Sequence, residues 1–166
     1  MLRIEGISKS YAKGSRRAVD DLTLHVEAGE IFGFLGPNGA GKTTTIKMIV
    51  GLLTPDSGRI AVDGRDVVQD PVGAKLGMGY VPDNPDLFDR LTGVEYLNFM
   101  GDVYGVPAGE RAKRIDSLLG MFELKGAVRD LVASYSHGMR QKLALTGALL
   151  SHPKLLVLDE PMVGLD

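Results

Sequence analysis

The sequence predicts an α/β fold in which a helical subdomain interrupts a core of strands and helices. Short β-type runs dominate the first third of the chain, and glycine or charged residues close each of them. From about residue 84 to residue 135 the apolar residues follow a helical period instead. The chain then returns to one helix and one apolar strand, so the helical stretch is interpreted as an insertion in an α/β core.

Six segments have the pattern of β-strands: Leu2–Ile7, Leu22–Val26, Ile31–Leu35, Arg59–Val62, Leu76–Val81 and Leu155–Leu158. In Leu22–Val26 apolar and polar residues alternate, which is typical of a half-buried strand. The segment Ile31–Leu35 is continuously apolar, so we expect a strand that is covered on both faces. We expect Leu155–Leu158 to be a buried strand as well.

Four segments have the pattern of helices. The first runs from Gly41 to about Val50. The second follows Thr92 and Glu95, which have the spacing of a capping box. The third begins near Pro107, with apolar residues on one face. The fourth covers Gly138–Leu150.

Composition limits the classes of protein to which the chain can belong. Its 166 residues are enough for one domain and few for two. The net charge is −2, from 19 basic and 21 acidic residues, so no strong positive field favours nucleic acid as a partner. The chain has no cysteine. No apolar run approaches the roughly 20 residues that span a bilayer, so a role at a membrane needs another protein as anchor.

The segment Gly36–Thr43 matches the phosphate-loop pattern G-x-x-x-x-G-K-[ST] in full. Glycines let backbone N–H groups turn towards phosphates, the lysine reaches the β- and γ-phosphates, and the threonine hydroxyl is a ligand for Mg²⁺. The helix that follows directs its positive N-terminal end at the anion. The residues expected to contact ATP here are Gly36, Pro37, Asn38, Gly39, Ala40, Gly41, Lys42, Thr43 and Thr44.

The apolar strand Leu155–Leu158 ends in two carboxylates, Asp159 and Glu160. Ligands of α/β sheets bind at the carboxyl ends of the strands. We expect Asp159 to hold Mg²⁺ directly or through water, because Mg²⁺ prefers oxygen ligands. Glu160 is then the candidate catalytic residue, which orients the attacking water or accepts its proton. The alternative is that both side chains only end a strand as solvated charges.

Together with the phosphate loop and the Asp-Glu strand end, further motifs make the chain resemble the ABC ATPase family over essentially its whole length. The stretch Tyr135–Gln141 resembles the L-S-G-G-Q signature, and Gly164–Asp166 resembles the D-loop. Asp83 stands in the place of the Q-loop glutamine, and Tyr11 stands where the family stacks an aromatic ring on adenine. The resemblance implies a P-loop NTPase core with a mostly parallel sheet and flanking helices. It also implies an N-terminal antiparallel β part and an inserted helical subdomain.

The resemblance also implies partners. Two such domains form a head-to-tail homodimer or heterodimer with ATP between them, and Ser136, Gly138 and Asp166 contact nucleotide. The helical subdomain docks on a transmembrane permease subunit, which places the chain peripherally at the cytoplasmic face of the cell membrane. The implied division is an ATP-binding core (1–83), the helical subdomain (84–135), and a return to the core with the signature helix, the Asp-Glu strand and the D-loop (136–166).

Several residues depart from the family pattern. His137 replaces a signature glycine, and Met139 replaces the signature glutamine. Asp83 is shorter than glutamine and cannot donate a hydrogen bond when ionised, although its carboxylate remains a ligand for Mg²⁺. Tyr11 has the alternative of a packed surface ring, and Ser136 that of a simple helix cap.

Family members continue past the D-loop into a strand that carries a switch histidine. That strand lies between the phosphate-loop strand and the Asp159 strand in the implied fold. Without it, backbone groups and apolar surface are left uncovered in the middle of the sheet. We therefore expect one incomplete domain, a truncated piece that is poorly stable and slow as an ATPase.

Three functions are consistent with the sequence. The first is ATP hydrolysis that powers transport of an unknown substrate through a separate membrane subunit. The second is a truncated fragment that binds nucleotide but is catalytically impaired. The third is a soluble ABC ATPase that acts on ribosomes or DNA, although the chain has no tandem domain, long coiled-coil insertion or basic tract.

Overall fold

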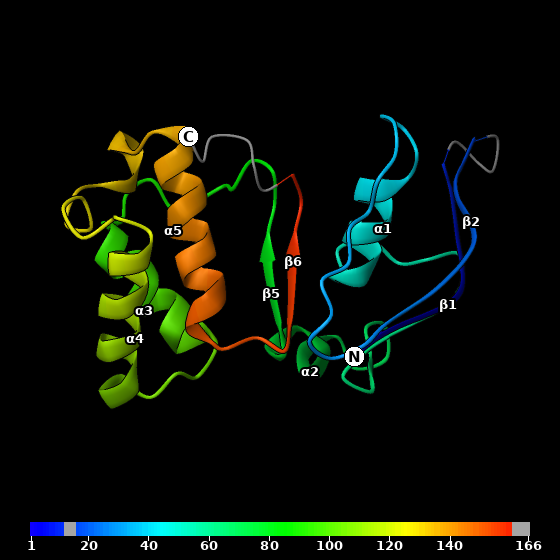
Figure 1. Cartoon of the computed structure of the whole chain (residues 1–166), viewed down its shortest axis with the longest axis horizontal. Coiled ribbons are helices and arrows are strands. Elements are labelled where there is room, and N and C mark those ends of the chain that lie inside the picture. Colours follow the sequence, from blue (N-terminus) through cyan, green and yellow to red (C-terminus); the bar gives the residue numbers. More distant parts are fainter. Residues whose placement is uncertain (12–15, 161–166) are drawn as a thin grey trace. The chain divides into compact units, whose positions relative to one another are not determined.

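The computed structural model describes residues 1–11 and 16–160. The chain forms two units, Met1–Met78 and Gly79–Asp166, each with its own set of internal contacts (Figure 1). None of the helices in the described ranges is both long enough and apolar enough to cross a membrane.

The first unit is built on an antiparallel sheet. Its strands are β1 (Leu2–Tyr11), β2 (Arg16–Val26), β3 (Ser57–Val62) and β4 (Arg65–Asp66), in the order β2-β1-β3-β4. This confirms the first, second and fourth predicted strands, each of which is longer than the sequence pattern indicated.

A bulge in β1 keeps its apolar side chains on one face. Ile4 is opposite Leu24 and Ile7 is opposite Leu22, so β1 contains one more residue than β2 between these pairs. Gly6 has a φ of 56°, a conformation that glycine adopts at little cost. Because of this extra residue, Ile4 and Ile7 are both fully buried although they are three positions apart.

Two helices pack within the first unit. Helix α1 (Lys42–Ile49) confirms the predicted helix after the phosphate loop and buries Ile46, Met48 and Ile49. Helix α2 (Pro71–Leu76) was not predicted. It begins with Pro71 after Asp70, whose side chain accepts a hydrogen bond from the Gly73 N–H at 3.0 Å.

The prediction of a strand at Ile31–Leu35 is wrong. This segment has no regular secondary structure, and Ile31 and Leu35 are fully exposed. A strand persists only where neighbouring strands satisfy its backbone N–H and C=O groups. Neither of the sheets formed by the described residues includes this segment. The apolar side chains of Ile31 and Leu35 are therefore uncovered directly before the phosphate loop.

The second unit contains a small sheet and a group of helices. Strands β5 (Met78–Val81) and β6 (Leu155–Leu158) pair and run in the same direction (Figure 1). The helices are α3 (Gly93–Val103), α4 (Ala108–Met121), the 3₁₀ turn η1 (Val132–Ser134) and α5 (His137–Leu150). All were predicted except η1. The four residues of β6 are only half-buried, which corrects the expectation of a fully buried strand, because β5 is its one neighbour among the described strands.

The helices of the second unit share one apolar core. Helix α5 packs against α3 and α4. The predicted capping box at the start of α3 is confirmed, because the Thr92 side chain accepts from the Glu95 N–H and the Glu95 carboxylate accepts from the Thr92 N–H. The core residues with the lowest exposure are Leu97, Val132, Leu143 and Leu150.

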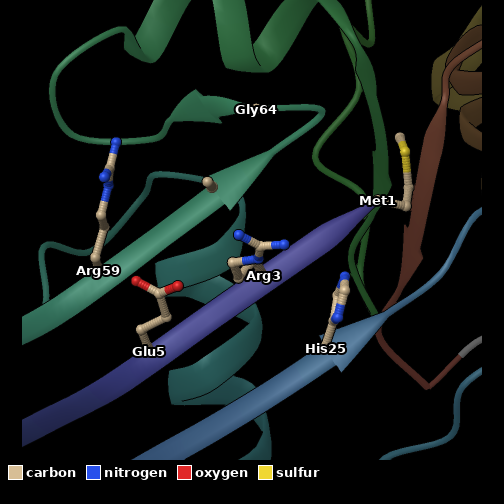
Figure 2. Close-up of a pocket in the computed structure, with 7 residues that line it drawn as sticks. Met1, Arg3, Glu5, His25, Arg59 and Gly64 are labelled. Carbon is tan, nitrogen blue, oxygen red and sulfur yellow. The ribbon is translucent and has the colours of Figure 1, made fainter.

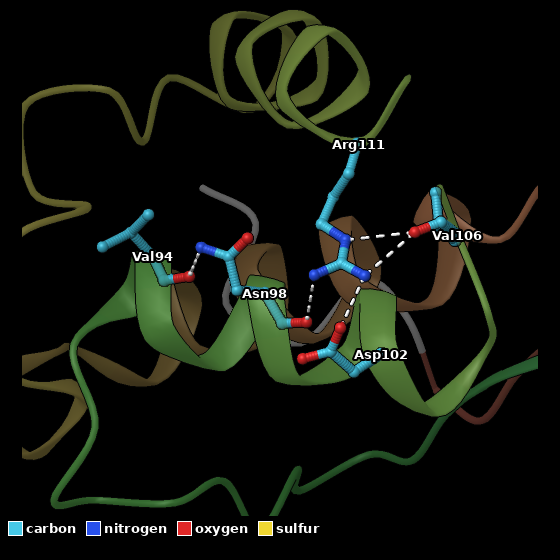
Figure 3. Close-up of polar contacts among 5 residues, drawn as sticks. All are labelled: Val94, Asn98, Asp102, Val106 and Arg111. Carbon is cyan, nitrogen blue, oxygen red and sulfur yellow. Dashed lines mark hydrogen bonds and ion pairs between the residues drawn. The ribbon is translucent and has the colours of Figure 1, made fainter. Parts of the chain in front are cut away.

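An arginine joins α3 to α4 (Figure 3). The Arg111 guanidinium forms an ion pair with Asp102 at 2.6 Å and donates to the carbonyl oxygens of Asn98 and Val106. A Cβ atom at Gly101 would lie 2.4 Å from Arg111 Nε, so the guanidinium crosses α3 where the helix has no side chain in its way. The Asn98 carbonyl belongs to α3 and the Val106 carbonyl to the loop that follows it, so Arg111 joins α4 both to α3 and to this loop.

Candidate phosphate-binding site

The phosphate loop is shaped by its own backbone hydrogen bonds. The Ala40 N–H donates to the Pro37 carbonyl at 3.2 Å, and Gly39 and Gly41 have φ values of 84° and 89°. The Lys42 ammonium donates to the carbonyl oxygens of Gly36 and Pro37 at 2.6 and 3.0 Å. The lysine charge is therefore held over the backbone of the loop.

Gly41 connects this loop to the antiparallel sheet. It is the residue before α1, and its φ is in the left-handed region. A Cβ atom at this position would lie 2.3 Å from the carbonyl oxygen of Ala18, in β2. Only glycine satisfies both conditions, so the start of α1 is fixed against β2 by a backbone-to-backbone contact.

The N-terminus of α1 is free to meet an anion. The first helical bond is donated by the Thr45 N–H to the Gly41 carbonyl at 2.8 Å, so the N–H groups of the three preceding residues lie outside the helical ladder. No side chain of the described residues caps this end, and the first turn contains no acidic residue. Thr43 is exposed and Thr44 is half-buried. The helix end and Lys42 together form a positive site of the kind that binds phosphate.

Asp159 and Glu160 lie directly after β6 in the second unit. The Asp159 N–H donates to the Val81 carbonyl at 3.0 Å, and its side chain is buried. Burial and the negative charge of Asp159 raise the pKa of the Tyr80 phenol, in the neighbouring strand β5. Glu160 is exposed and has a φ of 51°, which is a strained conformation for a residue with a side chain.

Ser136, Gly138 and Asp83 also lie in the second unit. The Ser136 hydroxyl caps α5 by accepting from the Met139 N–H at 3.3 Å. Gly138 is in the first turn of the same helix. Asp83 is exposed, and its backbone carbonyl accepts a hydrogen bond from Gln141 Nε2 at 2.9 Å. The sequence analysis did not identify Gln141, since only its burial distinguishes it from a surface glutamine.

The structure thus places the predicted site residues in two groups. The phosphate loop and Tyr11 belong to the first unit, where Tyr11 ends β1 and is 42% exposed. Asp83, Ser136, Gly138, Asp159 and Glu160 belong to the second. Asp166 and the rest of the predicted D-loop lie outside the described residues.

The metal ligands expected from the sequence have the chemistry that Mg²⁺ requires. Thr43, Asp83 and Asp159 supply hydroxyl and carboxylate oxygens, which are the ligands of a hard cation. The described residues contain no cluster of three His, Cys, Asp or Glu side chains that could hold a metal ion. Mg²⁺ bound by few protein ligands and completed by phosphate oxygens and water is consistent with this donor set.

A cavity of about 270 Å³ lies elsewhere in the first unit, on one face of the antiparallel sheet (Figure 2). Charged and polar side chains from β1, β2 and β3 line it, among them Arg3, Glu5, His25 and Arg59. Arg59 is paired with Asp66 at 2.7 Å. His25 is exposed on its strand. None of the residues that line this cavity belongs to the predicted phosphate site.

A glycine-rich loop that leads into a helix, with a lysine held over it, is typical of the phosphate-binding domains of the nucleotide-hydrolysing α/β class. A family model described as ABC transporter matches residues 19–163. The chain belongs to the ABC transporter family of ATP-binding proteins, as the sequence resemblance indicated.

Known proteins support this assignment. The linearmycin resistance ATP-binding protein LnrL of Bacillus subtilis (strain 168) is 41% identical over 166 residues, which is 100% of this chain and 53% of that protein. The chain therefore spans about half the length of this curated relative. A solved ATP-binding subunit of an ABC transporter is 34% identical, with a TM-score of 0.93 over 99% of this chain and 68% of that one.

A further solved structure shows a relative in a dimer. It is an ATP-binding cassette in a post-hydrolysis state with bound ADP and Pi. It is 25% identical, with a TM-score of 0.88 over 100% of this chain and 76% of that one. These likenesses confirm the predicted fold class, a P-loop NTPase core with an antiparallel β part and a helical subdomain.

The contact between Gly41 and Ala18 generates a prediction. We expect Gly41→Ala to lower the free energy of unfolding by about 3 kcal/mol or more, because the new Cβ atom meets a backbone oxygen in addition to an unfavourable φ. Gly29→Ala is the matched control, since Gly29 has a similar φ of 81° and no atom within 4 Å of the new Cβ. It should cost only about 1 kcal/mol. Urea denaturation of both variants measures the difference, and equal losses would contradict the role of the close contact.

Proposed function

We propose that this chain binds Mg-ATP and hydrolyses it as the ATP-binding subunit of a transporter. The observation that carries the proposal is the phosphate loop, in which Lys42 and the uncapped start of α1 present positive charge and N–H groups together. The family assignment supports the same reaction. The transported substrate remains open.

Each residue has a defined task in this proposal. The loop Gly36–Thr44 holds the phosphates through backbone N–H groups, and Lys42 neutralises charge on the β- and γ-phosphates. Thr43, Asp83 and Asp159 hold Mg²⁺, which offsets the negative charge that develops on the phosphate oxygens. Glu160 orients the attacking water and accepts its proton, because its exposed carboxylate follows directly after a strand end. Tyr11 stacks on the base.

A second ATP-binding domain, identical or different, completes the site. Ser136 caps α5 and Gly138 lies in its first turn, so a helix N-terminus and a hydroxyl are available to the γ-phosphate of ATP held by the partner. The dimeric relative with ADP and Pi supports this arrangement. We assign Asp166 the same kind of contact from its position in the D-loop motif.

The helical subdomain (84–135) carries an apolar surface suited to a membrane subunit. The rings of Phe88 and Phe99 meet edge to face at 5.3 Å, and both are about half-exposed. Val103, four residues after Phe99 on α3, is exposed on the same face. Exposed aromatic residues of this kind are typical of protein interfaces. We propose that this surface binds the permease and holds the chain at the cytoplasmic face of the membrane.

One observation favours the alternative of an impaired fragment. The uncovered segment Ile31–Leu35 leads directly into the phosphate loop, so the loop has no strand to support it on that side. In that case the chain binds nucleotide with little or no turnover.

Binding is tested by thermal unfolding with and without Mg-ATP. At a hundredfold excess over Kd, ATP should stabilise the wild-type chain by about 2.7 kcal/mol, because it binds only the folded state. Lys42→Ala should melt cooperatively but gain no stability from ATP. An equal gain in both proteins would exclude the phosphate loop as the binding site, and a melt without cooperativity would contradict stable folding of these 166 residues.

Hydrolysis is tested at Glu160. Glu160→Gln should lower the rate of phosphate release by about 10²- to 10⁴-fold while the ATP-induced stabilisation is retained. Glu123→Gln is the matched control, since Glu123 is also exposed in the same unit and has a similar φ of 59°. Turnover that is absent in the wild-type chain favours the impaired fragment.

The docking surface is tested with Phe99→Glu. We expect an affinity-tagged wild-type chain to co-purify from detergent-solubilised membranes with a protein that has several membrane-spanning helices, identified by mass spectrometry. Phe99→Glu should lose this partner because a charge is placed in an apolar contact. Met121→Glu, at an exposed apolar site on α4, should retain it. Recovery of ribosomal proteins or DNA instead would favour the soluble alternative.

A further inference from the structure

Gln141 is a buried amide on helix α5 whose nitrogen is hydrogen-bonded while its oxygen is not bonded within the described part of the chain. Its side chain is 4% exposed. Its Nε2 donates to the carbonyl oxygen of Asp83 at 2.9 Å, while Oε1 has no partner among the described residues. A buried polar atom without a partner is destabilising, so an apolar side chain of the same size would fit this position better if packing were its only role.

The bond to Asp83 is one of four that join two segments of the second unit. The first segment, Pro82–Leu91, links β5 to α3, and the second, residues 132–141, covers η1 and the start of α5. Their other links are an Arg140–Asp89 ion pair at 2.7 Å and hydrogen bonds from the Ala133 N–H to the Asp89 carbonyl and from the Val132 N–H to the Leu91 carbonyl.

These links differ in how strongly water competes with them. The Arg140–Asp89 pair includes a carboxylate that is 59% exposed, so solvent and salt weaken it. The Gln141 amide is buried, where a hydrogen bond is stronger and water cannot replace it readily. Gln141 also follows Ser136 by little more than one helical turn, so it holds α5 close to its N-terminus.

We propose that Gln141 is a positioning residue that fixes the start of α5, with Ser136 and Gly138, relative to Asp83. The inference rests on the proposed function, in which these residues contact Mg-ATP. Gln141 touches no nucleotide and acts through the Asp83 backbone. Gln141 thereby makes the segment that holds Asp83 and the start of α5 move as one body.

The test is amide hydrogen exchange in variants of the 166-residue chain. In Gln141→Leu, the Val132 and Ala133 amides, which donate to segment Pro82–Leu91, should exchange about tenfold faster, the factor that the loss of one net hydrogen bond produces. The Asp159 amide, which donates to β5, should be unchanged and serves as the internal reference. Arg140→Gln should have a smaller effect because the ion pair that it removes is exposed.

Rescue separates positioning from packing. In Gln141→Glu the new carboxyl can donate to the Asp83 carbonyl only when it is protonated. At acid pH the Val132 and Ala133 amides of this variant should therefore exchange at the wild-type rate. As the pH rises and the carboxyl ionises, they should exchange faster than the same amides of the wild-type chain at the same pH. Gln141→Met is a second apolar variant for the case in which leucine does not pack.

Turnover provides the functional readout. Gln141→Leu should keep the ATP-induced rise in melting temperature and the KM for ATP, and it should lower kcat. Unchanged exchange at Val132 and Ala133 in Gln141→Leu and Gln141→Met, or no recovery in Gln141→Glu at acid pH, overturns the proposal. A wild-type chain that binds no ATP overturns the proposed function instead, and the exchange ratios still decide whether Gln141 joins the two segments.

Discussion

The start of helix α1 can approach the Ala18 carbonyl oxygen only because residue 41 has no side chain. This contact fixes the direction of the helix against the antiparallel sheet, and with it the direction of the N–H groups and of Lys42. The sheet in turn depends on the bulge at Gly6, which keeps Ile4 and Ile7 on the buried face. In this family member the backbone conformation at Gly6 and Gly41 thus determines where the side chains of the candidate phosphate site lie.

Features that local sequence encodes were predicted well. The helix after the phosphate loop, the capping box of Thr92 and Glu95, and the limits of β6 all depend on residues within a few positions of one another. Helix α2 was missed because its six residues, with Pro71 and Gly73 among them, are too few to show a helical period.

The remaining differences depend on what surrounds a segment. Ile31–Leu35 has the composition of a central strand, but composition cannot supply the neighbouring strands that its backbone needs. The role of Gln141 could not be predicted either. A glutamine in a helix is usually exposed, and only the folded structure shows that this one is buried. The roles of Asp159 and Glu160 follow from motif and strand end, and those of Ser136 and Asp83 from resemblance.

Glu160 has a left-handed backbone conformation with a φ of 51°. Glycine or asparagine adopts this conformation at lower cost than glutamate, so a glutamate at position 160 lowers the stability of the fold. Selection of variants for thermal stability alone would replace Glu160, and under the role proposed for this residue it would enrich chains that bind ATP without turning it over. A library built to stabilise this domain therefore has to hold position 160 constant.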